Sequence, residues 1–153
     1  MGEAWRIVKV KHAATAFDGE GARLNGGRWN SVGLRVVYVS FAKSLAALEN
    51  LVHLKFPVAS KYVAIPLQFD DALVEIFPAA TLTVGWDAEP PSLISQQIGD
   101  EWTKNARSAL LALPSVITRE TNFLINPAHP DFIKIKIGKP EPFTFDPRLL
   151  GIK

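Results

Sequence analysis

Residues 22–52, ARLNGGRWNSVGLRVVYVSFAKSLAALENLV, carry the strongest structural signal in this chain of 153 residues. The stretch opens with a glycine-rich loop, NGGRWNSVG at residues 25–33, in which two glycines precede Arg28 and Trp29. Glycine lets the backbone approach a ligand closely, and arginine offers a planar set of donors that suits phosphate. Taken alone, such a loop is more typical of a hairpin turn that carries a surface arginine.

The loop is followed by a strand and a helix. Residues 36–40, VVYVS, are β-branched and aromatic, which is typical of a strand. The spacing then predicts a helix over residues 42–56, with one apolar stripe formed by Leu45, Leu48, Val52 and Phe56. Glu49 falls at the margin of that stripe. A charge there needs a partner or a cavity, but a solvent-reaching glutamate in contact with His53 explains the position equally well.

Two segments of the chain resemble the RES domain family. The first is residues 22–52, and the second is LPSVITRETNFLINPAHPDF at residues 113–132, which matches a proline-serine pair followed by an NxLxNPxHP segment. The resemblance covers essentially the whole chain. The family is named for an arginine, a glutamate and a serine, which correspond here to Arg28, Glu49 and Ser115.

Composition narrows the class of protein. With 48% hydrophobic residues, residues 1–153 can form one domain with a full core. The net charge of +2 and the scattered bases give no argument for direct nucleic-acid binding. The absence of cysteine excludes disulfides, thiolate nucleophiles and cysteine-bound metals. No secretory signal or membrane-spanning stretch is evident, so a cytoplasmic location is expected.

The rest of the chain predicts an α+β fold, because several short strands accompany about two helices without βαβ alternation. The second helix begins after Ser92, with Leu93, Ile94, Ile98 and Trp102 on its buried side. Further strands are expected at residues 5–10, 61–69, 73–77, 109–113, 123–125 and 133–137. The family resemblance implies an ADP-ribosyltransferase-like fold, in which two small antiparallel sheets with flanking helices hold a dinucleotide.

The resemblance also implies an enzyme that acts on NAD⁺ at the bond between nicotinamide and ribose. Phosphate as the acceptor would make it an NAD⁺ phosphorylase, and water would make it an NAD⁺ glycohydrolase. NAD⁺ is then a substrate, with inorganic phosphate as an alternative co-substrate, and no cofactor is expected. Because the transition state places positive charge on the ribose, a carboxylate such as Glu49 would stabilise it.

The same resemblance assigns roles to other residues. Arg28 would clamp the pyrophosphate, Tyr38 would meet nicotinamide, and Ser115 would bind the ribose or the carboxamide. Trp29 and Asn126 are further candidates for substrate binding. Without the family, core packing explains Tyr38 and Trp29, and turn or capping roles explain Ser115, Asn122 and Asn126. The three histidines share no ligand spacing, so no metal site is expected.

Two alternatives remain open on the sequence. The chain could be an ADP-ribosyltransferase that modifies a macromolecule, or a non-catalytic interaction domain of the same fold. RES proteins resemble the toxic half of bacterial toxin–antitoxin pairs. That resemblance implies a partner, an Xre-type antitoxin that covers the active cleft, in a homodimer or a hetero-oligomer with the antitoxin.

Overall fold

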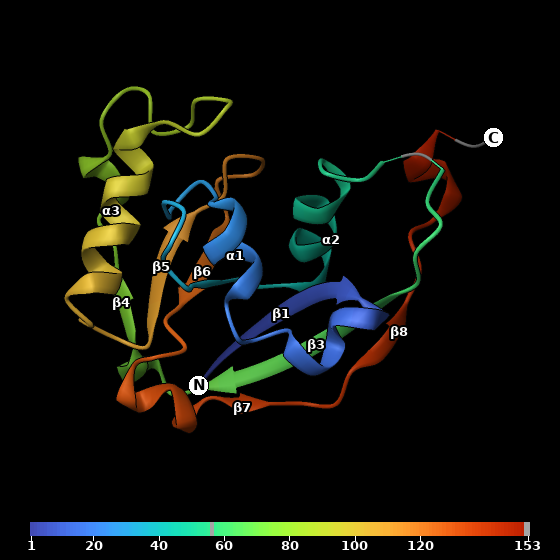
Figure 1. Ribbon diagram of the computed structural model, residues 1–153, viewed down its shortest axis with the longest axis horizontal. Helices are drawn as coiled ribbons and strands as arrows, with labels where there is room; N and C mark the ends of the chain where they lie inside the picture. Colours follow the sequence, from blue (N-terminus) through green and yellow to red (C-terminus); the bar gives the residue numbers. More distant parts are fainter. Residues whose placement is uncertain (56, 152–153) are drawn as a thin grey trace.

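A computed structural model describes residues 1–55 and 57–151 and shows a curled sheet with α-helices around it (Figure 1). The sheet has eight strands in the order β4-β5-β6-β2-β1-β3-β7, and β8 also pairs with β3. The strands are β1 (Gly2–Lys9), β2 (Val37–Ser40), β3 (Tyr62–Phe69), β4 (Val74–Ile76), β5 (Leu110–Pro114), β6 (Thr121–Ile125), β7 (Lys136–Ile137) and β8 (Glu141–Phe143).

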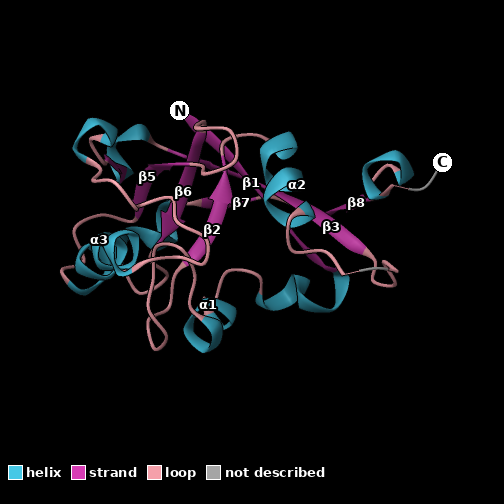
Figure 2. Cartoon of the chain, turned by 90° about the horizontal axis from the view of Figure 1, so that it is seen from above, coloured by secondary structure: helices cyan, strands magenta, loops and turns pink. Residues whose placement is uncertain are grey.

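The described residues form three α-helices and five short 3₁₀ helices. The α-helices are α1 (Glu20–Asn25), α2 (Lys43–Leu51) and α3 (Leu93–Lys104), and the 3₁₀ helices are Val10–Thr15, Asp71–Leu73, Ala79–Thr81, Pro130–Lys134 and Pro147–Leu150. Seen from above, the strands β6 and β2 appear between α3 and α2 (Figure 2). No described helix combines the length and the apolar character that crossing a membrane requires.

The α+β class is confirmed, but the expectation of two small antiparallel sheets is wrong. The sheet is continuous and mixed, because β4 and β5 run parallel while the other pairs are antiparallel. Its two halves meet where Trp5 of β1 pairs with Ser40 of β2. Alternation in a sequence predicts strands, but it does not say which strand edges pair.

Arg6 strengthens this β1–β2 junction with side-chain hydrogen bonds. Its Nη1 donates to the carbonyl of Tyr38 at 2.9 Å, and its Nε donates to the carbonyl of Ala16 at 2.7 Å. Burial lowers the pKa of the Arg6 guanidinium to about 10, so it remains charged at neutral pH. The two halves are therefore joined by few backbone bonds and by a half-buried cation.

Helix α2 is shorter than the predicted helix over residues 42–56, and Phe56 lies outside the described residues. Leu45 is buried as expected, but Leu48 and Val52 are exposed, and Ala46 takes their place in the core. The prediction of the apolar stripe is thus only partly correct. The small Ala46 side chain lies in the same core cluster as Ile7 of β1, so the helix approaches the sheet closely there.

Helix α3 begins after Ser92 and buries Trp102, as predicted, and Ile98 packs against the same cluster, but the rest of its buried side differs. Leu93 is 69% exposed, and the buried residues are Ser95, Gly99 and Trp102. A Cβ atom on Gly99 would lie 1.7 Å from the carbonyl oxygen of Trp29. The helix therefore packs backbone to backbone against the glycine-rich loop, which a search for large apolar residues does not detect.

The strand expected at residues 133–137 is also wrong. Residues Pro130–Lys134 form a 3₁₀ helix, and only Lys136–Ile137 joins the sheet. Ile133 is 87% exposed. Proline fixes φ at a value that suits a first helical position, and His129 caps the turn by accepting from the N–H of Asp131. These local signals override the alternating isoleucines.

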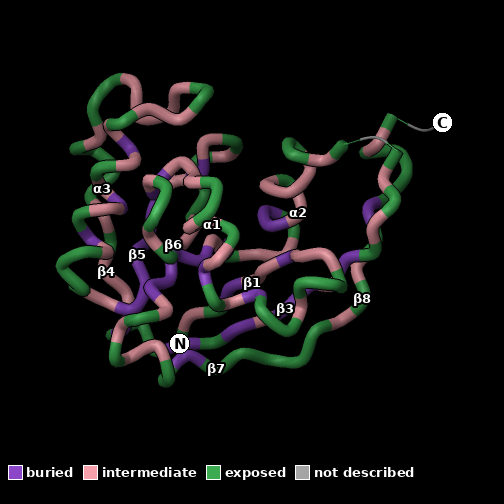
Figure 3. Tube along the Cα trace, in the orientation of Figure 1, coloured by how far each residue is buried: buried purple, intermediate pink, exposed green. Residues whose placement is uncertain are grey.

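The buried residues gather along the strands (Figure 3). One face of β2, β5 and β6 packs with Trp29 and Trp102, and the opposite face packs with residues of β1 and β3. The first face is the one that faces α3 and the glycine-rich loop. It also carries the polar residues that form the candidate site.

Candidate functional site

The backbone register brings distant polar residues to one face of the sheet. Tyr38 and Ser40 of β2 lie opposite Leu124 and Asn122 of β6. Alternate residues of a strand share a face, so Tyr38, Ser40 and Asn122 point to the same side. Ser115 comes one residue after the end of β5 and is buried. This face is bordered by α2, which supplies Glu49.

Glu49 is held by two neutral donors. The hydroxyl of Ser115 donates to Glu49 Oε1 at 2.7 Å, and Nδ2 of Asn122 donates to the same oxygen at 2.9 Å. Ser40 in turn donates its hydroxyl to Oδ1 of Asn122 at 2.6 Å. No ion pair joins Glu49 to His53 within the part of the chain that the structure describes. The four residues Glu49, Ser115, Asn122 and Ser40 are called the Glu49 network below.

Ser115 has a fixed place in this network. It is 1% exposed, and its hydroxyl accepts from the backbone N–H of Ile117 at 3.0 Å and of Thr118 at 3.3 Å. A hydroxyl has one proton to donate, and here that proton goes to Glu49. Ser115 therefore connects the carboxylate to the turn that follows β5.

Tyr38 fixes the glycine-rich loop. Its hydroxyl donates to Oδ1 of Asn30 at 2.6 Å and accepts from the N–H of Trp29 at 3.0 Å. A Cβ atom on Gly27 would lie 2.6 Å from the hydroxyl, so the contact requires glycine. Burial raises the pKa of the Tyr38 phenol above its ordinary value, and the nearby charge of Asp100 adds to this.

Asn30 is a residue that the sequence analysis missed. It is fully buried, and its Nδ2 donates to the carbonyls of Ala22, Ser31 and Leu34. Its only sequence signal is its place in the loop directly after Trp29. Asn30 and Tyr38 together fix the backbone of the loop that carries Arg28.

Arg28 is not in the Glu49 network. Its Nη1 donates to the carbonyls of Ala88 at 2.8 Å and Trp86 at 3.3 Å, and its Nη2 donates to Glu89 Oε2 at 2.9 Å. Its side chain is 15% exposed. All three contacts lie on residues 86–89, which are called the Arg28-bound segment below.

The Arg28-bound segment also contacts the turn after Ser115. The ring of Trp86 stacks on Trp29 at 5.8 Å on one side, and the guanidinium of Arg119 lies 4.8 Å from its centroid. Arg119 also pairs with Asp87 at 2.8 Å. Arg28 and Ser115 are thus connected through this segment, although they make no direct hydrogen bond.

The remaining candidates lie away from Glu49. Trp29 is 3% exposed and packs with Trp102 in the core. Asn126 follows β6 at the end opposite to Asn122, where its Oδ1 accepts from the N–H of Ala128 at 3.0 Å. The structure therefore brings Glu49, Ser115 and Asn122 together and leaves Asn126 in a local turn.

The site has the chemistry of an isolated, positioned carboxylate. Its donors are neutral, so the charge of Glu49 is solvated without being cancelled. Such a group stabilises positive charge that develops beside it. Within residues 1–55 and 57–151, no three metal-ligating side chains form a cluster.

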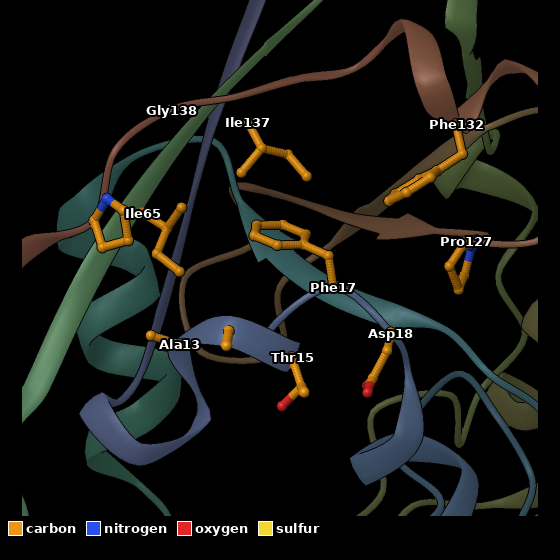
Figure 4. Close-up of a pocket in the computed structure, with 11 residues that line it drawn as sticks. Ala13, Thr15, Phe17, Asp18, Ile65, Pro127, Phe132, Ile137 and Gly138 are labelled. Carbon is orange, nitrogen blue, oxygen red and sulfur yellow. The ribbon is translucent and has the colours of Figure 1, made fainter.

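A separate open hollow of about 630 Å³ lies outside the Glu49 network (Figure 4). Phe17, Phe132 and Ile137 line it, together with Ile65 of β3. Its lining includes one carboxylate, Asp18, and no cation. It does not contain the residues expected to bind a dinucleotide.

Comparison with known proteins gives a consistent pattern. The family model described as "RES domain" matches residues 3–146. A protein of Sphingobium sp. (strain YBL2) named Prs ADP-ribosylating toxin is 43% identical over 154 residues, with 95% of each chain covered. A protein of Photorhabdus laumondii named Toxin Res is 34% identical, with 97% of each chain covered.

One solved structure has a similar fold. It is the crystal structure of the M. tuberculosis MbcT–MbcA toxin–antitoxin complex, in which the matched chain gives a TM-score of 0.76 at 16% identity. The match covers 94% of the present chain and 84% of the other. At this identity the likeness concerns the fold alone.

Proposed function

The chain belongs to the RES domain family, and on that premise we propose that it is a toxin that cleaves the bond between nicotinamide and ribose in NAD⁺. The observation that carries the proposal is the Glu49 carboxylate, which two neutral donors hold through one oxygen. The names of the relatives, Toxin Res and Prs ADP-ribosylating toxin, support the toxin class and the use of an ADP-ribosyl donor.

The chemistry needs few groups. Nicotinamide leaves with the electron pair of the glycosidic bond and becomes neutral, so no acid is needed to protonate it. The ribose carbon becomes cationic, and Glu49 stabilises that charge. Phosphate then forms the new bond to give ADP-ribose 1″-phosphate, or water attacks and loses a proton to give ADP-ribose.

Arg28 is the proposed contact for the pyrophosphate, because a guanidinium binds two phosphate oxygens at once. Its present partners are two carbonyls and one carboxylate of the Arg28-bound segment, which are the acceptors that a phosphate would replace. Tyr38 is assigned to holding the loop that carries Arg28, since both functions of its hydroxyl are used there.

A second candidate function is transfer of ADP-ribose to a protein. The specific observation in its favour is the 43% identity to a protein named as an ADP-ribosylating toxin. The bond cleaved is the same, and only the acceptor differs. A non-catalytic domain is less well supported, because it would have no use for a carboxylate held in this way.

We also propose that an antitoxin protein binds the chain in the cytoplasm. The similar fold was found in a toxin–antitoxin complex of M. tuberculosis. The family resemblance implies an Xre-type antitoxin that covers the active cleft.

Product analysis tests these proposals. Purified protein is incubated with NAD⁺ labelled in the adenosine and the nicotinamide, with and without phosphate, and with and without a bacterial protein extract. Free nicotinamide in any condition supports the cleavage. Adenosine label on ADP-ribose, on its phosphate ester or on protein identifies water, phosphate or protein as the acceptor. If folded, partner-free protein releases no nicotinamide in any of these mixtures, the proposal is wrong.

A further inference from the structure

We propose that Asn122 is a positioning residue for Glu49, and that Ser40 anchors its amide. This inference rests on the proposed function, because it concerns the carboxylate assigned to the ribosyl cation. Asn122 touches neither Arg28 nor the glycine-rich loop within the described contacts. Its effect on the reaction would pass through Glu49 alone.

The amide of Asn122 is hydrogen-bonded at both ends. Oδ1 of Asn122 accepts from Ser40 at 2.6 Å, and Nδ2 donates to Glu49 Oε1 at 2.9 Å. A flipped amide would place Oδ1 against Oε1, so that two acceptors would face each other. The carboxylate of Glu49, which can only accept, therefore fixes the orientation, and the hydroxyl of Ser40 donates to the amide oxygen that this orientation presents.

The sheet fixes where this amide lies. Ser40 and Asn122 are direct cross-strand partners in the pairing of β2 with β6. Directly opposed residues of antiparallel strands have Cβ atoms about 5 Å apart. The donor to Glu49 thus rests on two paired strands and not on a mobile loop.

The two oxygens of Glu49 are left in different states. Oε1 accepts from both Ser115 and Asn122, whereas Oε2 has no hydrogen bond within the described part of the chain. No buried side-chain oxygen in that part lacks a partner, so Oε2 reaches solvent. Two donors on one oxygen restrict rotation of the carboxylate. With one donor alone the carboxylate could still rotate. Asn122 therefore keeps Oε2 available in one direction for the substrate.

The substitution Asn122→Asp tests this role through pH. The introduced carboxyl has nearly the same shape, but it donates a hydrogen bond only while it is protonated. When ionised it repels Glu49. We expect kcat for nicotinamide release to fall about 10²-fold relative to wild type near pH 8, the size of effect that misplacement of a reacting group produces, and to recover as pH falls towards about 5.

Two further variants provide the controls. Asn105→Asp adds the same charge at the exposed end of α3 and should follow the wild-type pH profile. Ser40→Ala removes the anchor of Oδ1 but leaves the amide bonded to Glu49, which fixes its orientation, and it should lower kcat by less than Asn122→Ala does, with KM little changed. An equal loss for Asn122→Asp at every pH, or kcat within about twofold of wild type near pH 8, would overturn the proposal.

A stability measurement separates this inference from the proposed function. The variants Glu49→Ala, Asn122→Ala and their combination are compared by thermal unfolding. If Asn122 holds Glu49, the combined loss of Tm is smaller than the sum of the single losses. Additive losses refute the contact, whatever the wild type does to NAD⁺. Non-additive losses with an inactive wild type refute the NAD⁺ reaction but leave the pairing of Asn122 with Glu49 established.

Discussion

At the scale of single residues, the charge of Glu49 can be separated from its hydrogen bonds. Glu49→Gln keeps an oxygen that accepts from Ser115 and Asn122, so Tm should change little. The charge that we propose stabilises the ribosyl cation disappears. We expect NAD⁺ consumption to fall by about 10²–10³-fold, as for the loss of one preorganised electrostatic group. Activity within a few-fold of wild type, measured as nicotinamide release, would make Glu49 a boundary residue only.

The buried phenol of Tyr38 predicts a loss of stability at alkaline pH. Burial raises its pKa in the folded state above the unfolded value of about 10. The contribution of Tyr38 to the free energy of unfolding is therefore complete below about pH 10. It is lost as pH rises above that value, because only the unfolded chain then releases the phenol proton readily.

Thermal unfolding and absorbance both check this prediction. The Tm of wild type should fall more steeply above about pH 10 than the Tm of Tyr38→Phe, which starts lower because Asn30 and the N–H of Trp29 lose their partner. Part of the phenol absorbance change of wild type should be delayed until unfolding, and this delayed part should be absent from Tyr38→Phe. Parallel Tm curves for the two proteins would show that Tyr38 ionises without penalty.

The residue scale also shows what a sequence can reveal. The spacing of apolar residues in the predicted helix over residues 42–56 placed Glu49 at the margin of its apolar face. The side chain of Glu49 is half-buried there. Its bond to Ser115 joins residues 66 positions apart, and its bond to Asn122 depends on the pairing of β2 with β6. No local pattern contains that information, so Asn122 looked like an ordinary turn or capping residue.

At the scale of elements, the close packing of α3 against the glycine-rich loop depends on one glycine, Gly99. Gly99→Ala would place a methyl group 1.7 Å from the carbonyl oxygen of Trp29, so helix and loop must separate. We expect a loss of about 3 kcal/mol in the free energy of unfolding, at the upper end of overpacking effects. Denaturant unfolding measures it.

A matched control lies in α1. A Cβ atom on Gly21 would meet no atom within 4 Å, so Gly21→Ala should be neutral or stabilise by up to about 1 kcal/mol through helix propensity. If Gly99→Ala is as mild as Gly21→Ala, the close contact between α3 and Trp29 is incorrect.

Arg28→Lys tests the Arg28-bound segment. A lysine has one nitrogen and cannot reproduce the two-pronged contact to Ala88 and Glu89. We expect faster proteolysis within residues 86–89 and a substantially lower kcat/KM for NAD⁺, mostly through KM if the contact is equal in the ground and transition states. Arg148→Lys, on the exposed pair with Asp146, is the control. Unchanged kinetics with NAD⁺, together with an unchanged rate of proteolysis, would make Arg28 an ordinary turn residue.

The elements differ in how well local patterns predicted them. The strand at residues 36–40 was predicted from its β-branched and aromatic composition, and the strand at residues 109–113 from its continuous apolar run. The helical stripe and the strand at residues 133–137 failed where Ala46 or Pro130 decides the local geometry. Small residues and prolines act through backbone approach and fixed φ, which hydrophobic periodicity does not measure.

At the scale of the whole molecule, an enzyme that destroys NAD⁺ or modifies host proteins requires a partner in its own host. We expect expression of the chain alone to stop bacterial growth, and co-expression of the neighbouring gene to restore growth, block NAD⁺ loss and yield a copurifying complex. Glu49→Gln should be harmless alone and still copurify. If the wild-type chain is harmless at high expression while active on NAD⁺ in vitro, the toxin proposal fails and the enzyme proposal stands.

The β1–β2 junction has a consequence for hydrogen exchange. Glu49 lies on α2, which packs on β1, whereas Ser115 and Asn122 follow or belong to β5 and β6 on the other side of the junction. A hinge motion between the halves would separate donor from acceptor before either half unfolds. Amides of α2 and of the turn after β5 should then exchange through one shared opening, with a common protection factor. A ligand that contacts both halves would slow exchange at both places at once, and a ligand that contacts one half would not.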